Sequence, residues 1–329
     1  MMQTDSPLAA KQRGMAVISA LLIAAVVAVI AGGMLTRQTL FTRSLEAEQL
    51  RVQGTARLQG GLQLSRQLLW DARQRDPLTR FGQPWANPIV MPGSGQIDTP
   101  FEGQLEDEQG KFNLRNLVAN ERVDEEQVRA FERLCQQLGV AQAVSTRIVE
   151  RVVEAYPRLL NPQRVDQAPK ANTFNSGRET SPQADNTPQA PTRPMLRTLQ
   201  DLRSVKGVNA RLLETLAPYV TILPTNTWLN GNTASAPVLA AYVPGLSLQR
   251  AEALVRERDG GHWFINRGDF VNRLRMPELD TASVKVGITS DWFLLRGQAR
   301  SGQRRVELEA LLQRTEDRLP QVIWSRVGV

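Results

Sequence analysis

The hydrophobic pattern at the start of the chain is one long apolar run. Residues 15–36 contain no ionisable side chain, and Lys11 and Arg13 precede them. Because about 20 apolar residues cross a bilayer as a helix, the run is long enough for a membrane anchor. A cleaved secretory signal is the alternative, since Val-Ile-Ala at 29–31 before Gly32 has the small residues of such a cleavage site.

The pattern becomes amphipathic after the apolar run, and the next proline is Pro77. Leu58, Leu62 and Leu69 recur at spacings that place them on one helical face. We therefore predict that a single helix continues from the apolar run to about Arg75, with two separate helices as the alternative.

Three glycines lie within this amphipathic part: Gly54, Gly60 and Gly61. A glycine inside a helix costs roughly 1 kcal/mol relative to alanine. A local bend or a melted turn is therefore expected there.

The segment FEGQLEDEQGKFNLRNLV at 101–118 is predicted to form a β-hairpin. Apolar and polar residues alternate from Phe101 to Leu105, Gln109-Gly110 supplies a turn, and Phe112 resumes the apolar face. Acidic residues surround this turn, and we expect them at a solvated hairpin tip rather than around a metal. They are Glu102, Glu106, Asp107 and Glu108.

The middle of the chain is mostly helical in pattern. Residues 122–156 are predicted to be helical, whereas 161–194 are rich in proline and poor in large apolar residues, so a long mobile loop is expected there. Two helices broken at Lys206-Gly207 are predicted within 196–220. Residues 229–274 predict further short helices.

Strand patterns return at the end of the chain. Residues 290–314 hold two strand-like runs around Ser301-Gly302, and 320–327 hold another. Strands therefore lie on both sides of a helical block. This order predicts an α+β fold, in which an antiparallel sheet packs on the long N-terminal helix and a large all-α domain is inserted between its strands.

Composition narrows the function classes. The net charge is +7, but basic and acidic residues are interspersed, as expected for solvated helix faces rather than a nucleic-acid surface. Cys135 is the sole cysteine and His262 the sole histidine, which excludes an intrachain disulfide and a His/Cys zinc cluster. No Cys–His dyad is expected. Cys135 is expected to pack as a small hydrophobe. No pattern supports an enzyme.

One segment keeps a second function open. Within 229–274, Asn232 or Thr233 is placed to cap a helix, and Pro244-Gly245 separates that helix from the next. This arrangement resembles a helix-hairpin-helix module, which would make the chain a membrane-anchored DNA-binding protein for DNA uptake. The hairpin lacks a second glycine, and the charges around Arg250 are mixed, so packing without DNA is the preferred interpretation.

The start of the chain resembles type IV prepilins and pseudopilins. These have a basic leader ending in glycine, then an apolar helix that continues as an amphipathic one. The resemblance implies prepilin peptidase cleavage between Gly14 and Met15 and N-methylation of Met15. Most members have glutamate at the fifth mature position, which here is Ser19. Ser19 lacks the carboxylate that is thought to pair with the amine of the subunit ahead. Sequence drift or another cleavage position is the alternative explanation.

Further motifs resemble the K-type minor pseudopilins of type II secretion systems (the general secretion pathway protein K family). They are GKFNLRNL at 110–117, the block from DLRSVKG to LNGNTAS, and the late SDWF. The resemblance implies a pilin-like protein with an inserted helical domain. The expected division is a leader at 1–14, a transmembrane helix at 15–36, its periplasmic continuation at 37–76, a sheet from 77–118 and 281–329, and the inserted domain at 119–280 with its loop at 161–194.

The resemblance also implies a role at the tip of the pseudopilus. There the protein would initiate or cap assembly for export of folded proteins across the outer membrane. The implied partners are the I-type and J-type minor pseudopilins, the major pseudopilin, the prepilin peptidase and the inner-membrane secretion platform, and no nucleic acid is expected. The protein would be a single-pass inner-membrane protein with its C-terminal domain in the periplasm.

Calcium is a further family property, linked to an acidic Asp-Trp-Leu-Asp-x-Asp stretch. Calcium requires six to eight oxygen ligands, so several carboxylates must converge. That stretch is absent here, and Asp166, Glu179 and Asp185 are spread along the expected loop. No metal ligands are therefore assigned from the sequence.

Overall fold

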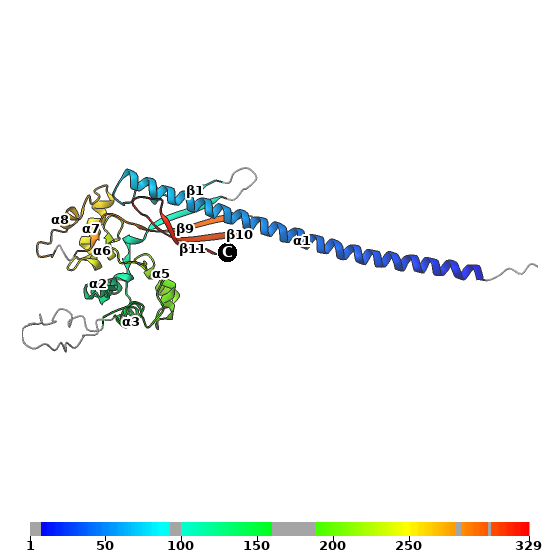
Figure 1. The fold of residues 1–329 in the computed structure, drawn as a ribbon, viewed down its shortest axis with the longest axis horizontal. Helices are drawn as coiled ribbons and strands as arrows, with labels where there is room; N and C mark the ends of the chain where they lie inside the picture. Colours follow the sequence, from blue (N-terminus) through cyan, green and yellow to red (C-terminus); the bar gives the residue numbers. More distant parts are fainter. Residues whose placement is uncertain (1–7, 93–99, 160–187, 281–283, 302–303, 329) are drawn as a thin grey trace, which may run out of the picture.

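The structure is a computed structural model that describes residues 8–92, 100–159, 188–280, 284–301 and 304–328. Its dominant element is α1 (Leu8–Arg75), a single helix whose N-terminal part projects away from the rest of the molecule (Figure 1). The prediction of one continuous helix is confirmed, and the alternative of two helices is wrong. The C-terminal part of α1 lies on the sheet and supplies Leu58, Leu62 and Leu69 to its core.

The helix runs without interruption through the glycines that were expected to weaken it. Gly61 faces the ring of Phe101 so closely that a Cβ atom would lie 2.3 Å from the ring Cζ. Gly103 and Gly297 border the same ring, at 2.7 Å and 2.6 Å from their would-be Cβ atoms. Glycines from a helix and two strands thus form a slot for one aromatic side chain, which lets α1 approach the sheet closely.

Replacing Gly61 with alanine is therefore expected to destabilise the protein, because the new methyl group must displace the Phe101 ring in a packed core, at a cost of about 1–3 kcal/mol. The roughly 1 kcal/mol that alanine contributes in a helix offsets only part of this cost. Thermal unfolding of the full chain in detergent measures it. Gly33→Ala is the matched control, since nothing lies within 4 Å of a Cβ there. A Gly61→Ala variant as stable as the wild type would contradict the slot.

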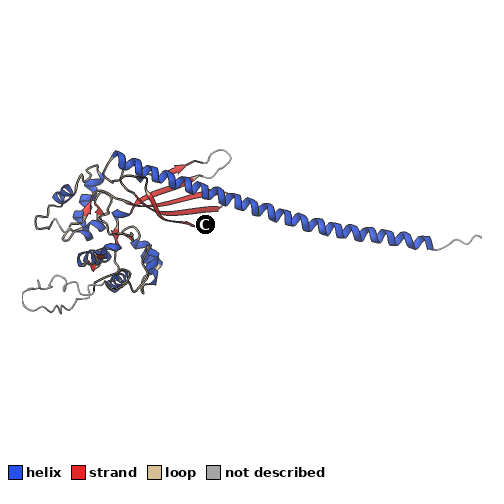
Figure 2. Ribbon diagram, viewed as in Figure 1, coloured by secondary structure: helices blue, strands red, loops and turns tan. Residues whose placement is uncertain are grey.

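The sheet has five antiparallel strands in the order β1-β2-β9-β10-β11 (Figure 2). Strand β9 is central, and its Leu295 lies opposite Leu105 of β2 and Ala310 of β10. The predicted α+β class is confirmed, with the long helix on one face of the sheet. The strand bounds are β1 (Ile89–Met91), β2 (Phe101–Asp107), β9 (Trp292–Ser301), β10 (Arg304–Gln313) and β11 (Gln321–Gly328).

Apart from α1 and η1, the helical elements follow β2 and precede β9 in the chain, and they lie together at the end of the sheet distant from the projecting part of α1 (Figure 1). The α-helices are α2 (Glu125–Gln137), α3 (Gln142–Val153), α5 (Ala210–Leu216), α6 (Ala236–Tyr242), α7 (Leu248–Asp259) and α8 (Arg267–Leu274). The 3-10 helices are η1 (Pro84–Ala86), η2 (Glu108–Gly110), η3 (Leu114–Leu117) and η4 (Leu199–Ser204). Short strands complete the set: β3 (Phe112–Asn113), β4 (Val118–Ala119), β5 (Arg122–Val123), β6 (Val220–Thr221), β7 (Leu229–Asn230) and β8 (Val286–Gly287).

The predicted hairpin at 101–118 is wrong. After β2 the chain enters η2, and β3 then pairs in parallel with β6 instead of returning along β2. The acidic residues at this turn are not at a solvated tip, because Asp107 and Glu108 are only 7% and 4% exposed. The alternation of apolar residues continued across the turn, but Phe112 belongs to a different core.

Two separate hydrophobic cores show how the chain is divided. Phe101 and Leu105 pack under α1, whereas Phe112 and Val118 pack with the inserted helices. The boundary between the core under α1 and the core of the inserted helices therefore lies at Asp107, not after residue 118 as the sequence predicted. Val286, which the sequence assigned to the sheet, also packs with the inserted helices.

Two other expectations concern local structure. The residue before α6 is Ser235, so the expected helix cap at Asn232 or Thr233 is wrong. Most of the expected loop at 161–194 lies outside the described residues. Its described end bridges back to the helical domain through the backbone of Gln189, which pairs with Arg158.

Candidate functional site

The apolar part of α1 is the first candidate site. Val17–Thr42 is a 26-residue span whose most apolar 18-residue window has a mean hydropathy of 2.6, and its side chains are exposed. At a rise of 1.5 Å per residue it extends about 39 Å, enough to cross a hydrocarbon core of about 30 Å. Exposed aliphatic side chains over such a length fit a membrane anchor.

The residues predicted for prepilin peptidase cleavage and methylation lie on this helix. Gly14 and Met15 are inside α1, and Ser19 lies exposed near the start of the apolar span. The geometry is compatible with cleavage and methylation but does not test either. These assignments remain predictions.

A second candidate site is the polar joint between the sheet and the inserted domain. At its centre is Asp107, whose Oδ2 accepts hydrogen bonds from Ser290 Oγ (2.6 Å), Thr233 Oγ1 (2.6 Å) and Asn230 Nδ2 (2.9 Å). Its Oδ1 accepts from the backbone N–H of Gln109 at 2.9 Å. Burial raises the pKa of the Asp107 carboxyl, and these hydrogen bonds oppose the rise.

Asn230 extends this network to Thr79, in the segment that follows α1. Its Nδ2 also donates to the Thr79 carbonyl oxygen at 3.0 Å and lies 2.8 Å from Ser290 Oγ. Arg314, only 2% exposed, donates from Nη2 to Thr79 Oγ1 (2.5 Å) and to the Ser290 carbonyl oxygen (2.6 Å). Burial lowers the pKa of Arg314 to about 10, so the guanidinium is still charged at neutral pH. The buried guanidinium of Arg314 and the buried carboxyl group of Asp107 are thus linked by neutral residues. Both hydrogen-bond to Ser290, and Asn230 connects Asp107 to Thr79.

An ion-paired lysine borders the joint. Lys111 Nζ lies 2.7 Å from Glu108 Oε1 and 2.9 Å from Glu106 Oε2. Burial alone lowers the pKa of Lys111, but the two carboxylates outweigh burial and raise it. Glu108 also accepts a hydrogen bond from the Thr221 hydroxyl, which ties η2 to β6. Arg296 on β9 continues the row of charges, with Nη1 2.7 Å from Glu106 Oε1.

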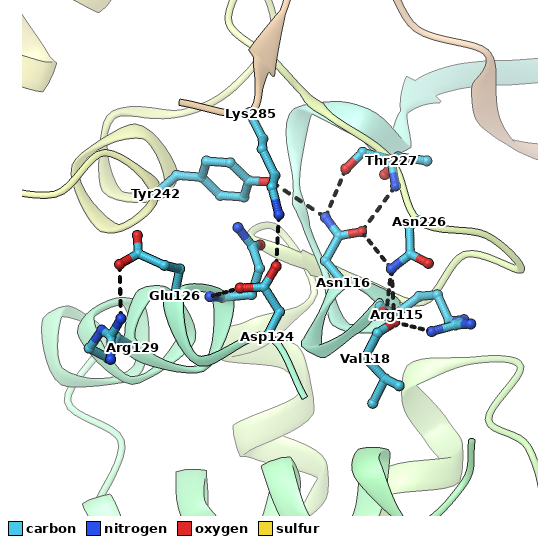
Figure 3. Close-up of polar contacts among 11 residues, drawn as sticks. Arg115, Asn116, Val118, Asp124, Glu126, Arg129, Asn226, Thr227, Tyr242 and Lys285 are labelled. Carbon is cyan, nitrogen blue, oxygen red and sulfur yellow. Dashed lines mark hydrogen bonds and ion pairs between the residues drawn. The ribbon is translucent and has the colours of Figure 1, made fainter. Parts of the chain in front are cut away.

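Asparagine side chains connect the GKFNLRNL segment to residues 226–227 inside the inserted domain. Asn116 pairs with the backbone of Thr227, donating from Nδ2 to the carbonyl oxygen (2.8 Å) and accepting the N–H at Oδ1 (3.0 Å) (Figure 3). Asn226 donates in return to the carbonyl oxygens of Arg115 and Val118, each at 3.0 Å. The side chains of Asn116 and Asn226 thus hydrogen-bond to backbone groups, and they hold the chain in place before β7.

The same figure shows how α2 is held. The carboxylate of Asp124 caps the helix by accepting the N–H of Gln127 at 3.2 Å, and its other oxygen lies 2.7 Å from Lys285 Nζ (Figure 3). In LNGNTAS, Asn232 makes a similar backbone-like pair with Phe264, at 2.9 Å and 2.8 Å. These polar contacts connect segments that are far apart in the sequence.

The helix-hairpin-helix segment, for which packing without DNA is the preferred interpretation, is covered by other parts of the protein. Gly245 has a left-handed φ of 79°, but a Cβ there would meet Met276 Cε at 3.1 Å, so Met276 covers the turn. Arg250 donates from Nη2 to the carbonyl oxygen of Leu274 and so caps the end of α8. The groups that would contact a phosphate are therefore engaged in packing the helices together.

The described residues contain no group of three or more His, Cys, Asp or Glu that could hold a metal ion. Asp166, Glu179 and Asp185 lie outside the described residues. Cys135 is buried in the helical core as predicted, and burial raises the pKa of its thiol to about 12. A thiol with that pKa is not a nucleophile at neutral pH.

Comparison with known proteins gives one consistent family. Two models described as "Type II secretion system (T2SS), protein K" match residues 110–225 and 229–289. The type II secretion system protein K of Pseudomonas aeruginosa is 31% identical, over 96% of this chain and 93% of its own length. That of Pectobacterium carotovorum is 28% identical, over 97% of both chains.

A solved structure has the same fold. A chain in the GspK–GspI–GspJ complex from the type 2 secretion system of enterotoxigenic Escherichia coli superposes with a TM-score of 0.62, covering 86% of this chain and 98% of that one. The sequence identity of this pair is 20%, so the likeness concerns the fold. Neither these matches nor the occupied hairpin supports the DNA-binding alternative. The family models and the full-length relatives together show that the chain belongs to the protein K family of type II secretion systems, the K-type minor pseudopilins.

Proposed function

We propose that this chain forms the tip of the type II secretion pseudopilus, together with I-type and J-type minor pseudopilins. The protein is anchored in the inner membrane by its apolar helix, with the sheet and the inserted domain in the periplasm. It starts or caps the assembly that exports folded proteins and performs no catalysis. Its further partners are the major pseudopilin, the prepilin peptidase and the inner-membrane platform.

The observation that carries this proposal is the position of the inserted domain. It lies beyond the sheet, at the end distant from the projecting part of α1 (Figure 1). In a filament of parallel long helices, a subunit ahead would need the space that this domain fills. A subunit with such an insertion fits at an end that nothing follows.

The partners are supported by the solved relative, which was crystallised as a GspK–GspI–GspJ complex. Ser19 supports the end position independently. A carboxylate inside a bilayer is costly and needs a partner, such as the amine of a subunit ahead. Serine at the fifth mature position makes no such demand, as expected for a leading subunit.

The tip position predicts where a label on the inserted domain will be found. We expect full-length I-type and J-type pseudopilins of the same organism to co-purify with this chain in detergent. Electron microscopy of pseudopili carrying an epitope after Glu278, which is exposed on the inserted domain, should show label at one end only. Label distributed along the shaft, or polymerisation of this chain alone, would contradict the tip position.

A further inference from the structure

The outer face of the sheet, on the side opposite α1, carries an apolar row. Successive residues of a strand point to opposite faces, and Phe293 and Leu295 lie in the core under α1, so Leu294 lies on the outer face. Leu294 is paired with Leu311 of β10, and Leu311 is paired with Trp324 of β11. Because cross-strand partners share a face, these three side chains form one row across the sheet.

A row of charges lies beside this apolar row. Arg296 of β9 is paired with Glu309 of β10, and Glu309 is paired with Arg326 of β11. Arg296 Nε lies 3.5 Å from Glu309 Oε1, and Arg326 forms an ion pair with the same carboxylate. An extended segment laid against this part of the sheet would therefore meet apolar side chains on one line and guanidinium groups on the next.

The inserted domain turns the apolar row into the floor of a cavity. Helix α5 lies on the side of the sheet away from α1 (Figure 1). Its Leu213, the following Ala217 and Ile222 after β6 line a cavity of about 130 Å³ together with the apolar row. An apolar cavity of about 150 Å³ can hold a benzene molecule. The space between the two domains is therefore large enough for one apolar side chain.

The charged residues around this cavity are mostly basic. Among the described residues that line it, the basic ones are Lys111, Arg197, Arg296 and Arg326, and the acidic ones are Glu108 and Glu309. Both carboxylates already have basic partners, since Glu108 Oε1 lies 2.7 Å from Lys111 Nζ and Glu309 is paired as above. Arg197, just before η4, is exposed and gives the rim an excess of positive charge. Such a rim favours carboxylates in an occupant, because hydrogen bonds between guanidinium and carboxylate groups are strong.

We infer that this cavity binds an extended acidic segment of a partner protein. One apolar side chain of the segment enters the cavity, and a carboxylate lies on each side of it. One carboxylate faces the charged row of Arg296 and Arg326, and the other faces Arg197 on the inserted domain. We call this site the β9–α5 cavity. It adds a binding site that the proposed function does not include.

The segment comes from a protein outside the filament. In a filament of parallel long helices, α1 faces the helices of the other subunits. The sheet separates α1 from the β9–α5 cavity, since Leu295 packs under α1 and Leu294 lines the cavity. The cavity therefore opens on the side of the sheet that is turned away from the neighbouring helices.

The test titrates a fluorescein-labelled peptide, Gly-Ser-Glu-Leu-Glu-Ser-Gly, with the full-length chain in detergent and measures fluorescence anisotropy. We expect saturable binding. Replacing the leucine of the peptide with serine should weaken binding at least about tenfold, because the buried leucine side chain supplies much of the affinity. The peptide Gly-Ser-Lys-Leu-Lys-Ser-Gly should not bind, since its charges match those of the rim.

Two substitutions in the protein should remove the site. Ala217→Trp fills the cavity and Arg197→Glu reverses the charge at its rim, so each is expected to weaken binding of the acidic peptide at least about tenfold. Arg203→Glu is the matched control, because Arg203 is an exposed residue of η4 that does not line the cavity. It should leave the affinity unchanged. Arg197→Glu changes an exposed side chain and should melt with the wild type, so it tests the site even if Ala217→Trp disturbs the fold.

The outcomes separate this inference from the proposed function. Absence of peptide binding, equal binding of the acidic and basic peptides, or full binding by Arg197→Glu would overturn the site. Loss of I-type or J-type co-purification in Arg197→Glu would place a filament subunit in the cavity instead. Self-association of the wild type that Ala217→Trp abolishes would place a second copy of this chain there. Each of these results overturns the inference, and the proposed function stands as long as the wild type co-purifies with its partners.

Discussion

Replacing Asp107 with alanine is expected to lower the free energy of unfolding by about 3–5 kcal/mol. The substitution removes the acceptor of Ser290, Thr233 and Asn230, and each buried donor left without a partner costs about 1–3 kcal/mol. Some donors regain partners by rotation, so the sum is not fully lost. At about 2–4 °C per kcal/mol for a domain of this size, thermal unfolding in detergent should shift by roughly 10 °C.

Two variants separate hydrogen bonding from the loss of a side chain. Asp107→Asn is expected to be destabilised as well, because either orientation of the amide turns its NH₂ group toward a donor: the three side chains at Oδ2 or the Gln109 N–H at Oδ1. Glu102→Gln on the same strand is the control, since Glu102 is exposed and substitutions at such sites change stability by less than about 0.5 kcal/mol. An Asp107→Ala variant that melts with the wild type would show that the joint does not stabilise the fold.

This joint could not be read from the sequence, although the elements around it could. The long helix and the strands β9 to β11 follow from local periodicity, which extends over many residues. The partners of Asp107 are 123, 126 and 183 positions away, so no local pattern connects them. An acidic turn buried against asparagine and serine has the same local sequence as an acidic turn in water.

The wrong hairpin has the same origin. Alternation of apolar residues identifies extended chain with one buried face, but it does not say which core receives that face. Phe101 packs under α1 and Phe112 packs among the inserted helices, although the alternation continues from one to the other. The signal that was available is the pair of asparagine-rich motifs, GKFNLRNL and LNGNTAS. Asparagine side chains that can replace backbone partners are typical of places where chain segments meet without regular structure.

The glycines of α1 show that a residue's cost in isolation does not decide its role. Gly61 weakens an isolated helix, and this predicted a bend. In the folded protein the same glycine allows the Phe101 ring to lie between helix and sheet. Packing thus reverses the local expectation, and no local pattern indicates this because the Phe101 ring is 40 positions away in the chain.

The other large effect concerns the start of the chain. Replacing Gly14 with valine is expected to abolish processing, since the prepilin peptidases of this family cleave after glycine and a branched side chain would enlarge the residue at the scissile bond. Mass spectrometry of the wild type should find a chain that begins at N-methylated Met15, and the Gly14→Val chain should keep its 14-residue leader. Incorporation into the pseudopilus should be lost, because the free amine at Met15 is never produced.

Gly32→Val is the matched control for this prediction. Gly32 follows the Val-Ile-Ala sequence that an ordinary signal peptidase would recognise, and nothing lies within 4 Å of a Cβ at this position, so the substitution disturbs no packing. We expect this variant to be processed after Gly14 and to stay in the membrane fraction. A wild-type chain that begins at Gly32 would contradict the assignment. Such a chain would lack most of Val17–Thr42, so it would leave the membrane fraction.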